Sequence, residues 1–147
     1  MTLATSKDNL PWVAHCFYAF MEKEMVLVFT TDDDTRHGQE MKENETVSAG
    51  IAWETKAVGQ IRGAQIEGRV VKIEKSKPER RKTSDERRLP PKLAYLKRFP
   101  YAALMKTTLW VLEIESIKYT DNRIGFGKKL NWSRKSTPIL FHPNQAD

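Results

Sequence analysis

The sequence lacks long hydrophobic runs and has almost no cysteine. No apolar run approaches the ~20 residues that a membrane-spanning helix needs. The first ten residues, MTLATSKDNL, have neither the basic start nor the apolar core of a signal peptide. The one cysteine, Cys16, cannot form an internal disulfide, and its apolar surroundings fit a buried small side chain in a reducing compartment. We therefore expect a cytoplasmic protein without membrane contact.

Common catalytic patterns are also missing. The three histidines and the single cysteine are scattered without the spacing of metal ligands, so we expect no metal site. There is no Gly-x-Ser-x-Gly elbow, no Walker loop and no dinucleotide-binding glycine fingerprint. The residue patterns therefore identify no catalytic acid, base or nucleophile.

Positive charge is in excess, with 25 lysines and arginines against 19 acidic residues and a net charge of +6. This balance favours anionic partners in general. Much of the basic content lies in Lys72–Arg88, where acidic residues are interleaved, as on a solvated helix face. Neither exposed aromatics nor a known nucleic-acid module accompanies it, so nucleic acid is not expected as a partner. At 147 residues the chain fits one domain, residues 1–147.

The chain does contain a succession of strand-like segments. Residues 25–31 (MVLVFTT) and Thr46–Trp53 (TVSAGIAW) are apolar and β-branched, and Gly59–Glu74 mixes apolar and polar residues at a period near two. Thr35 fits the N-cap of a helix over Arg36–Glu43. Successive strands with irregularly inserted helices favour an antiparallel barrel over a βαβ fold. Further strands are expected at Thr2–Thr5, Trp12–Phe20 and Thr108–Ser116, and further helices at Lys77–Leu89 and Lys92–Arg98.

The start of the first helix is a candidate phosphate-binding site, which we call the phosphate seat. Hydroxyls, a guanidinium and helix N-terminal amides are the donors that a phosphate needs. The three carboxylates of residues 32–34 would repel a phosphate if they faced it, or would favour the helix N-terminus from a solvated turn. The alternative interpretation is a capped surface helix with a salt bridge. The candidate residues are Thr30, Thr31, Thr35, Arg36 and His37.

A second candidate group, Gln60, Arg62 and Gln65, lies on one strand. Strict alternation places Gln60 and Arg62 on the face opposite Gln65, so a bulge at Gly63 is needed to bring them together. An inward arginine needs an anionic partner. The alternative interpretation is therefore a buried pair between Arg62 and a glutamate.

A third group follows the last long strand, in Thr120–Lys129. Its glycines permit backbone conformations that other residues avoid and allow a ligand to approach closely. Phe126 or Trp132 could stack on a planar ring, and Lys128 and Lys129 could meet a phosphate or an acidic substrate. A glycine-bounded hairpin is the simpler interpretation.

Three motifs carry a family resemblance that covers nearly the whole chain. They are Thr-Arg-His at Thr35–His37, Ile-Arg-Gly-x-Gln at Ile61–Gln65, and Lys-Tyr-Thr-Asp-Asn…Gly-Phe-Gly-Lys-Lys at Lys118–Lys129. With them the chain resembles a small uncharacterised branch of the pyridoxamine-phosphate oxidase-like, FMN-binding split β-barrel superfamily. Many relatives have lysine where this chain has His37, and relatives usually carry a helix before the first strand.

The resemblance implies a mainly β, single-domain split β-barrel of about six to seven mostly antiparallel strands with short inserted helices. It implies a homodimer that binds FMN or a related flavin at the subunit interface. If the protein is an enzyme, the reaction would be hydride or electron transfer through the flavin. The implied cofactor-binding residues are the three groups above: Thr30, Thr31, Thr35, Arg36, His37, Gln60, Arg62, Gln65, Lys128, Lys129 and Trp132.

Two other classes of function stay open. One is a non-enzymatic split-barrel module for another ligand, such as haem, a deazaflavin or a phosphorylated metabolite. The other is a basic interaction protein in which Arg80–Arg88, Lys128 and Lys129 meet an acidic partner or nucleic acid.

Overall fold

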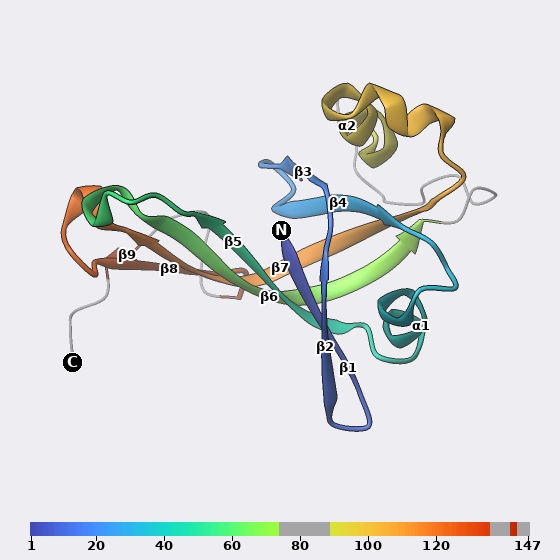
Figure 1. Ribbon diagram of the computed structural model, residues 1–147, viewed down its shortest axis with the longest axis horizontal. Helices are drawn as coiled ribbons and strands as arrows, with labels where there is room; N and C mark the ends of the chain where they lie inside the picture. The colour runs from blue at the N-terminus through green and yellow to red at the C-terminus, as the bar shows by residue number, and fades with distance from the viewer. Residues whose placement is uncertain (74–88, 136–141, 144–147) are drawn as a thin grey trace.

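One antiparallel sheet organises the protein. The computed structural model describes residues 1–73, 89–135 and 142–143, and the expected helix Lys77–Leu89 therefore lies outside the described residues but for its last position. Within these ranges the sheet has nine strands in the order β2-β1-β5-β6-β7-β4-β3, with β8 paired to β7 and β9 paired to β8 (Figure 1). The strands are β1 Thr2–Lys7, β2 Leu10–His15, β3 Tyr18–Met21, β4 Val26–Thr31, β5 Thr46–Trp53, β6 Arg62–Ile73, β7 Thr108–Asp121, β8 Lys129–Ser133 and β9 His142–Pro143.

The strand order makes the sheet curl. Its outermost strands on the main path are β2 and β3, yet only Cys16 and Phe17 separate these strands in the chain. The two edges are therefore held near one another, as in a barrel that is not fully closed. The long strands β6 and β7 run past the barrel and, with the end of β5 and with β8 and β9, form an arm at the left of Figure 1.

A bulge bends the longest strand pair. Gly68 faces Ile114 and Glu67 faces Ser116, so Glu115 is an extra residue in β7. A Cβ atom on Gly68 would lie 2.1 Å from the carbonyl oxygen of Glu113. Only glycine allows the two backbones to approach this closely.

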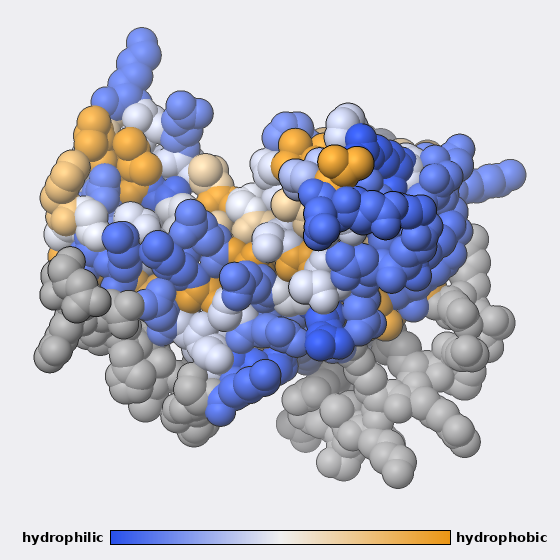
Figure 2. Space-filling view, turned by 90° about the horizontal axis from the view of Figure 1, so that it is seen from below, coloured by the Kyte–Doolittle hydropathy of each residue, from blue (hydrophilic) through white to orange (hydrophobic). Residues whose placement is uncertain are grey.

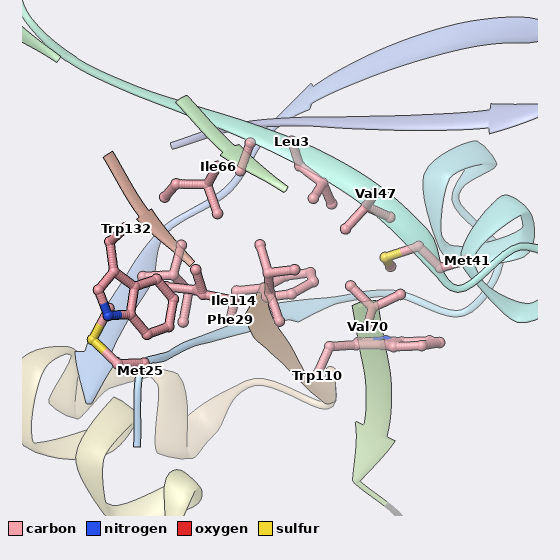
Figure 3. Close-up of a cluster of buried hydrophobic side chains, with 13 residues drawn as sticks. Leu3, Met25, Phe29, Met41, Val47, Ile66, Val70, Trp110, Ile114 and Trp132 are labelled. Atoms are coloured by element: carbon pink, nitrogen blue, oxygen red, sulfur yellow. The ribbon is translucent and has the colours of Figure 1, made fainter. Parts of the chain in front are cut away.

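The inside of the curl is the main hydrophobic core. Residues from six strands and α1 meet there, with Phe29 and Leu27 of β4 fully buried in the same cluster as Leu112 and Ile114 of β7 (Figure 3). The alternate residues of β4, Val26 and Val28, face a second cluster. Since β4 is buried on both faces, its sequence is continuously apolar rather than alternating.

In the described part of the chain, two α-helices pack on the sheet. α1 spans Arg36–Glu43, as expected, with Thr35 as its N-cap, and it inserts Met41 into the main core beside β1. α2 spans Pro91–Arg98, close to the expected Lys92–Arg98, and packs Tyr95 against β3 and β4 on the other face. The described residues also include three 3-10 helices: η1 Val58–Gln60 between β5 and β6, η2 Pro100–Leu104 between α2 and β7, and η3 Asn122–Ile124 between β7 and β8. No helix among the described residues is both long enough and apolar enough to cross a membrane.

The structure corrects several expected strands. The single strand expected at Trp12–Phe20 is two strands, because the chain leaves the pairing with β1 at Cys16 and starts pairing with β4 at Tyr18. Cys16 is thus half-buried between strands rather than within one. The strand expected at Gly59–Glu74 begins at Arg62, because η1 occupies its first residues. Together with β8 and β9 these changes raise the strand count from six or seven to nine, while the mainly β, antiparallel class is confirmed.

Candidate functional site at the start of helix α1

A compact polar cluster forms where β4 passes into α1. The hydroxyl of Thr31 lies 2.6 Å from Nε2 of His37 and 3.1 Å from the hydroxyl of Thr35. Thr35 accepts a hydrogen bond from the backbone N–H of Gly38 and donates one to the backbone oxygen of Asp32. The cap therefore satisfies one amide of the first turn and holds two hydroxyls beside the imidazole.

Thr30 does not join this cluster. Alternation along β4 turns its side chain to the opposite face, where its hydroxyl lies 3.1 Å from the hydroxyl of Tyr95 in α2. The structure thus gives Thr30 a role in attaching α2 to the sheet.

His37 is the titratable member of the cluster. Burial lowers the pKa of its imidazole below the ordinary value of 6.5, and the nearby carboxylate of Glu40 opposes this shift only in part. The imidazole is therefore neutral at pH 7, and it brings no fixed positive charge to the cluster.

Arg36, the first residue of α1, is held in place by contacts with Glu40 and Trp12. Its Nε donates to Oε1 of Glu40 over 2.8 Å, and its Cζ lies 4.3 Å from the ring centroid of Trp12 in β2. Glu40 is buried and also accepts a hydrogen bond from the hydroxyl of Thr5. The hydrogen bonds from Thr5 and Arg36 lower the pKa of Glu40, so this carboxylate is ionised.

The acidic turn before α1 does not form one uniform negative face. Asp33 lies 2.6 Å from Nζ of Lys72 and 3.8 Å from Nζ of Lys42, and the hydrogen bond from Lys72 lowers the pKa of Asp33. Asp32 and Asp34 are exposed to solvent. The predicted capped helix with a salt bridge is present, with Thr35 as the cap and Arg36 paired with Glu40.

The second predicted group does not assemble in one chain. The pairing of β6 with β5 and β7 is continuous from Arg62 to Glu67, so there is no bulge at Gly63. Gln65 consequently lies on the face opposite Arg62 and is exposed, and Gln60 lies in η1. Among the described residues Arg62 has no ion pair with a glutamate; it stacks 5.2 Å from the Trp53 ring centroid, and its buried Nε has no hydrogen-bond partner.

The third group forms the tip of the arm. Asn122 ties η3 to η1, because its Nδ2 donates to the backbone oxygen of Val58 over 2.8 Å. Asp121 accepts several hydrogen bonds from Arg123, which hold the pKa of the Asp121 carboxyl well below its usual range. Gly125 and Gly127 have positive φ values of 143° and 68°, as a tight connection into β8 requires.

The tip presents apolar and basic side chains together. Figure 2 shows hydrophobic residues gathered at the left end of the molecule, over the arm. Lys128 and Lys129 are exposed beside them. The large exposed hydrophobic residues of the arm are Trp53, Val58, Ile124 and Phe126.

Trp132 is separated from these lysines. It is buried and packs with Met25 in the main core (Figure 3). It also lines a cavity of about 550 Å³ with Ile117, Tyr18 and Tyr119. The walls of this cavity are mostly aliphatic and aromatic, and its polar residues are Glu22 and Lys23. Trp132 therefore belongs to an apolar cavity rather than to a phosphate-binding cluster.

The predicted site residues thus occupy separate places. Thr31, Thr35 and His37 meet at the start of α1, whose first residue is Arg36. The arm that carries Gln60, Arg62, Lys128 and Lys129 extends from the opposite end of the sheet (Figure 1). Residue patterns missed Thr5, Trp12 and Glu40. The i, i+4 spacing of Arg36 and Glu40 was a usable signal, while the contacts of Thr5 and Trp12 depend on the packing of β1 and β2 against α1.

Comparison with solved structures defines the class of fold. A split β-barrel fold is shared with a haem-binding protein of Mycobacterium smegmatis, at a TM-score of 0.68 and 17% identity over 90% of this chain; the chain spans about half, 51%, of that protein. It is also shared with a pyridoxamine 5'-phosphate oxidase-related, FMN-binding protein of Nostoc punctiforme, at a TM-score of 0.63 and 15% identity over 99% of this chain and 86% of the other. The expected split-barrel fold is thereby confirmed.

Sequence relatives place the chain more narrowly. The family model described as pyridoxamine 5'-phosphate oxidase matches residues 1–121. A UPF0306 protein of Photorhabdus laumondii is 38% identical over 134 residues, which cover 91% of this chain and 87% of the relative. The chain belongs to the pyridoxamine 5'-phosphate oxidase family and, within it, to the UPF0306 proteins.

Proposed function

We propose that the protein binds FMN non-covalently and holds its phosphate at the start of α1. The observation that carries this proposal is the placement of the Thr31 and Thr35 hydroxyls at the N-terminus of α1, whose first residue is Arg36. Hydroxyls, a guanidinium and the positive end of a helix are complementary to a phosphate monoester. The FMN-binding structural neighbour and the family match support the choice of ligand.

The predicted residues on the arm could contact the flavin only from a second copy of the chain. Arg62, Lys128 and Lys129 are on the arm, away from α1, so one chain cannot bring them to the phosphate. In a two-fold symmetric homodimer the arm of one copy can lie against α1 of the other. Each of the two sites would then combine a phosphate seat with the partner's basic arm.

A bound flavin would supply hydride or electron transfer. The residues of this chain would bind the phosphate, orient the ring and exclude water, and an oxidoreductase activity is the function that follows. We expect the protein to act in the cytoplasm.

We expect the phosphate seat to bind FMN more weakly than a site with lysine in place of His37 would. The neutral imidazole can donate one hydrogen bond and accept another, but it adds no charge. The exposed Asp32 and Asp34 add negative charge nearby. We therefore expect micromolar rather than nanomolar affinity, with binding that improves below pH 7 as His37 takes up a proton.

The test is a titration of the purified protein with FMN and with riboflavin, followed by flavin fluorescence. Removing a charge-assisted hydrogen bond costs about 1.5–3 kcal/mol, so Arg36→Ala should weaken FMN binding about tenfold or more. Riboflavin lacks the phosphate, so its affinity should change little. No saturable FMN binding by the unaltered protein would refute the proposed function.

Arg69→Ala is the matched control. The side chain of Arg69 is 55% exposed and pairs with Glu45 and Glu115, much as that of Arg36 is 48% exposed and pairs with Glu40. It lies on β6 and contacts none of the seat residues. Equal losses of FMN affinity in the two variants would point to net charge rather than to a phosphate seat.

Haem is a second candidate ligand. The apolar cavity of about 550 Å³ beside Trp132 favours it, and one structural neighbour binds haem. A hemin titration followed by the Soret band distinguishes the two, because haem in this cavity should be insensitive to Arg36→Ala.

A further inference from the structure

Arg36 is the centre of a chain of contacts that joins three elements. Its guanidinium lies over Trp12 of β2, at 4.3 Å from Cζ to the ring centroid, and its Nε donates to Glu40 one turn along α1. Glu40 in turn accepts from Thr5 of β1. Thr5 and Glu40 are both buried, so the carboxylate sits behind the arginine and not on the surface.

These contacts leave the two terminal nitrogens of Arg36, Nη1 and Nη2, free to bind a phosphate. A guanidinium has five N–H donors, and only the one on Nε is used by Glu40. No contact of Nη1 or Nη2 with a polar group is recorded within the described part of the chain, and the side chain is half exposed. Two neighbouring nitrogens with a fixed plane are the arrangement that binds two phosphate oxygens at once.

Glu40 could act in either of two ways. It could compete with phosphate for Arg36, or it could fix the guanidinium in the orientation that phosphate requires. The buried position of Glu40 and the single Nε contact favour the second, because competition would occupy the outward Nη atoms. Fixing a long side chain beforehand removes an entropic cost that binding would otherwise incur.

We infer that Thr5, Trp12 and Glu40 are positioning residues that orient Arg36 for the phosphate of a flavin nucleotide. They make the site selective for the phosphorylated ligand over the free flavin. The inference rests on the proposed function and deepens it. Glu40 fixes the direction of Nε, Thr5 fixes Glu40, and the Trp12 ring supports the guanidinium from the β2 side.

The experiment measures FMN and riboflavin affinities for Glu40→Gln, Thr5→Val, Trp12→Leu and Trp12→Phe. Loss of a positioning contact should weaken FMN binding about three- to tenfold and leave riboflavin within about twofold. Trp12→Phe keeps an aromatic face and should retain most of the FMN affinity. A fall in riboflavin affinity for Trp12→Leu would instead make Trp12 a ring-binding residue and overturn its positioning role.

Glu43→Gln is the matched control. Glu43 lies on the same helix and pairs with Lys7 of β1 over 2.8 Å, so it also joins α1 to β1 but does not touch Arg36. Its replacement should leave the ratio of FMN to riboflavin affinity unchanged. A change equal to that of Glu40→Gln would show that any weakening of the α1–β1 contact has the same effect, and would refute the inference.

The ligand-free protein provides an independent readout. The Nε–H of Arg36 should give a resolved NMR resonance, protected from exchange, that is lost in Glu40→Gln and kept in Glu43→Gln. If the unaltered protein binds no FMN, the proposed function is wrong and the inference falls with it. If Arg36→Ala weakens FMN binding but Glu40→Gln does not, or strengthens it, the inference alone is wrong.

Discussion

Because of the bulge between β6 and β7, we expect Gly68 to tolerate no side chain without a loss of stability. Replacing Gly68 with alanine places a Cβ atom 2.1 Å from the carbonyl oxygen of Glu113 and 3.0 Å from Cδ1 of Leu112. The first contact is with backbone, so it cannot be relieved by a rotamer change. β6 and β7 must move apart by about 1 Å to restore an ordinary contact, in a core packed as densely as a crystal.

The cost has two parts. Overpacking a well-packed core costs about 1–3 kcal/mol, and weakening a neighbouring ladder hydrogen bond costs about 0.5–1.5 kcal/mol more. We therefore expect Gly68→Ala to lower the free energy of unfolding by about 2–4 kcal/mol, and the Tm by about 4–15 °C. Urea denaturation followed by circular dichroism measures this directly.

Gly50→Ala is the control for the same chemical change. Gly50 lies in β5, and a Cβ atom built there meets nothing within 4 Å. Its replacement should be neutral or slightly stabilising, because alanine restricts the unfolded chain. If Gly68→Ala unfolds within about 0.5 kcal/mol of Gly50→Ala, the bulge tolerates a side chain and the reasoning is wrong.

Three further perturbations test the fold and the seat. Burial holds the pKa of His37 below 6.5 in the folded protein, so as the pH falls the unfolded chain takes up the proton first. The free energy of unfolding should therefore fall as the pH drops through 6.5, and it should fall less in His37→Gln. Urea midpoints at pH 5, 6 and 7 measure the difference. Tyr95→Phe removes the hydroxyl that meets Thr30, and should cost about 0.5–1.5 kcal/mol in urea denaturation without changing flavin binding. Phe29→Ala empties a fully buried site and should cost about 3–5 kcal/mol, measured in the same way.

Three results would contradict these expectations. A pH dependence that is identical in His37→Gln would assign the titration to other groups. A Tyr95→Phe variant that loses FMN would place Thr30 or α2 at the ligand after all. A small loss in Phe29→Ala would mean that the barrel interior can collapse around the missing ring.

Local residue patterns were sufficient for much of the fold. Thr46–Trp53 and Arg36–Glu43 have the bounds that their patterns predict, because strand periodicity and an N-cap act within a few residues of the chain. The convergence of Thr31, Thr35 and His37 follows from the same local cap. The family motifs added the split barrel, which the structural comparisons confirm.

Tertiary structure alone decided the rest. The strand that begins at Leu10 ends before Cys16 because the chain changes partner from β1 to β4, and the bulge falls at Gly68 rather than Gly63 because β7 carries the extra residue, Glu115, at that point. Pairing and register are set by contacts between residues distant in the chain, and no local pattern encodes them. For the same reason the sequence determined which donors are available for a phosphate, while the folded sheet decided that the arm extends from the end opposite α1 and that Trp12 and Glu40 hold Arg36.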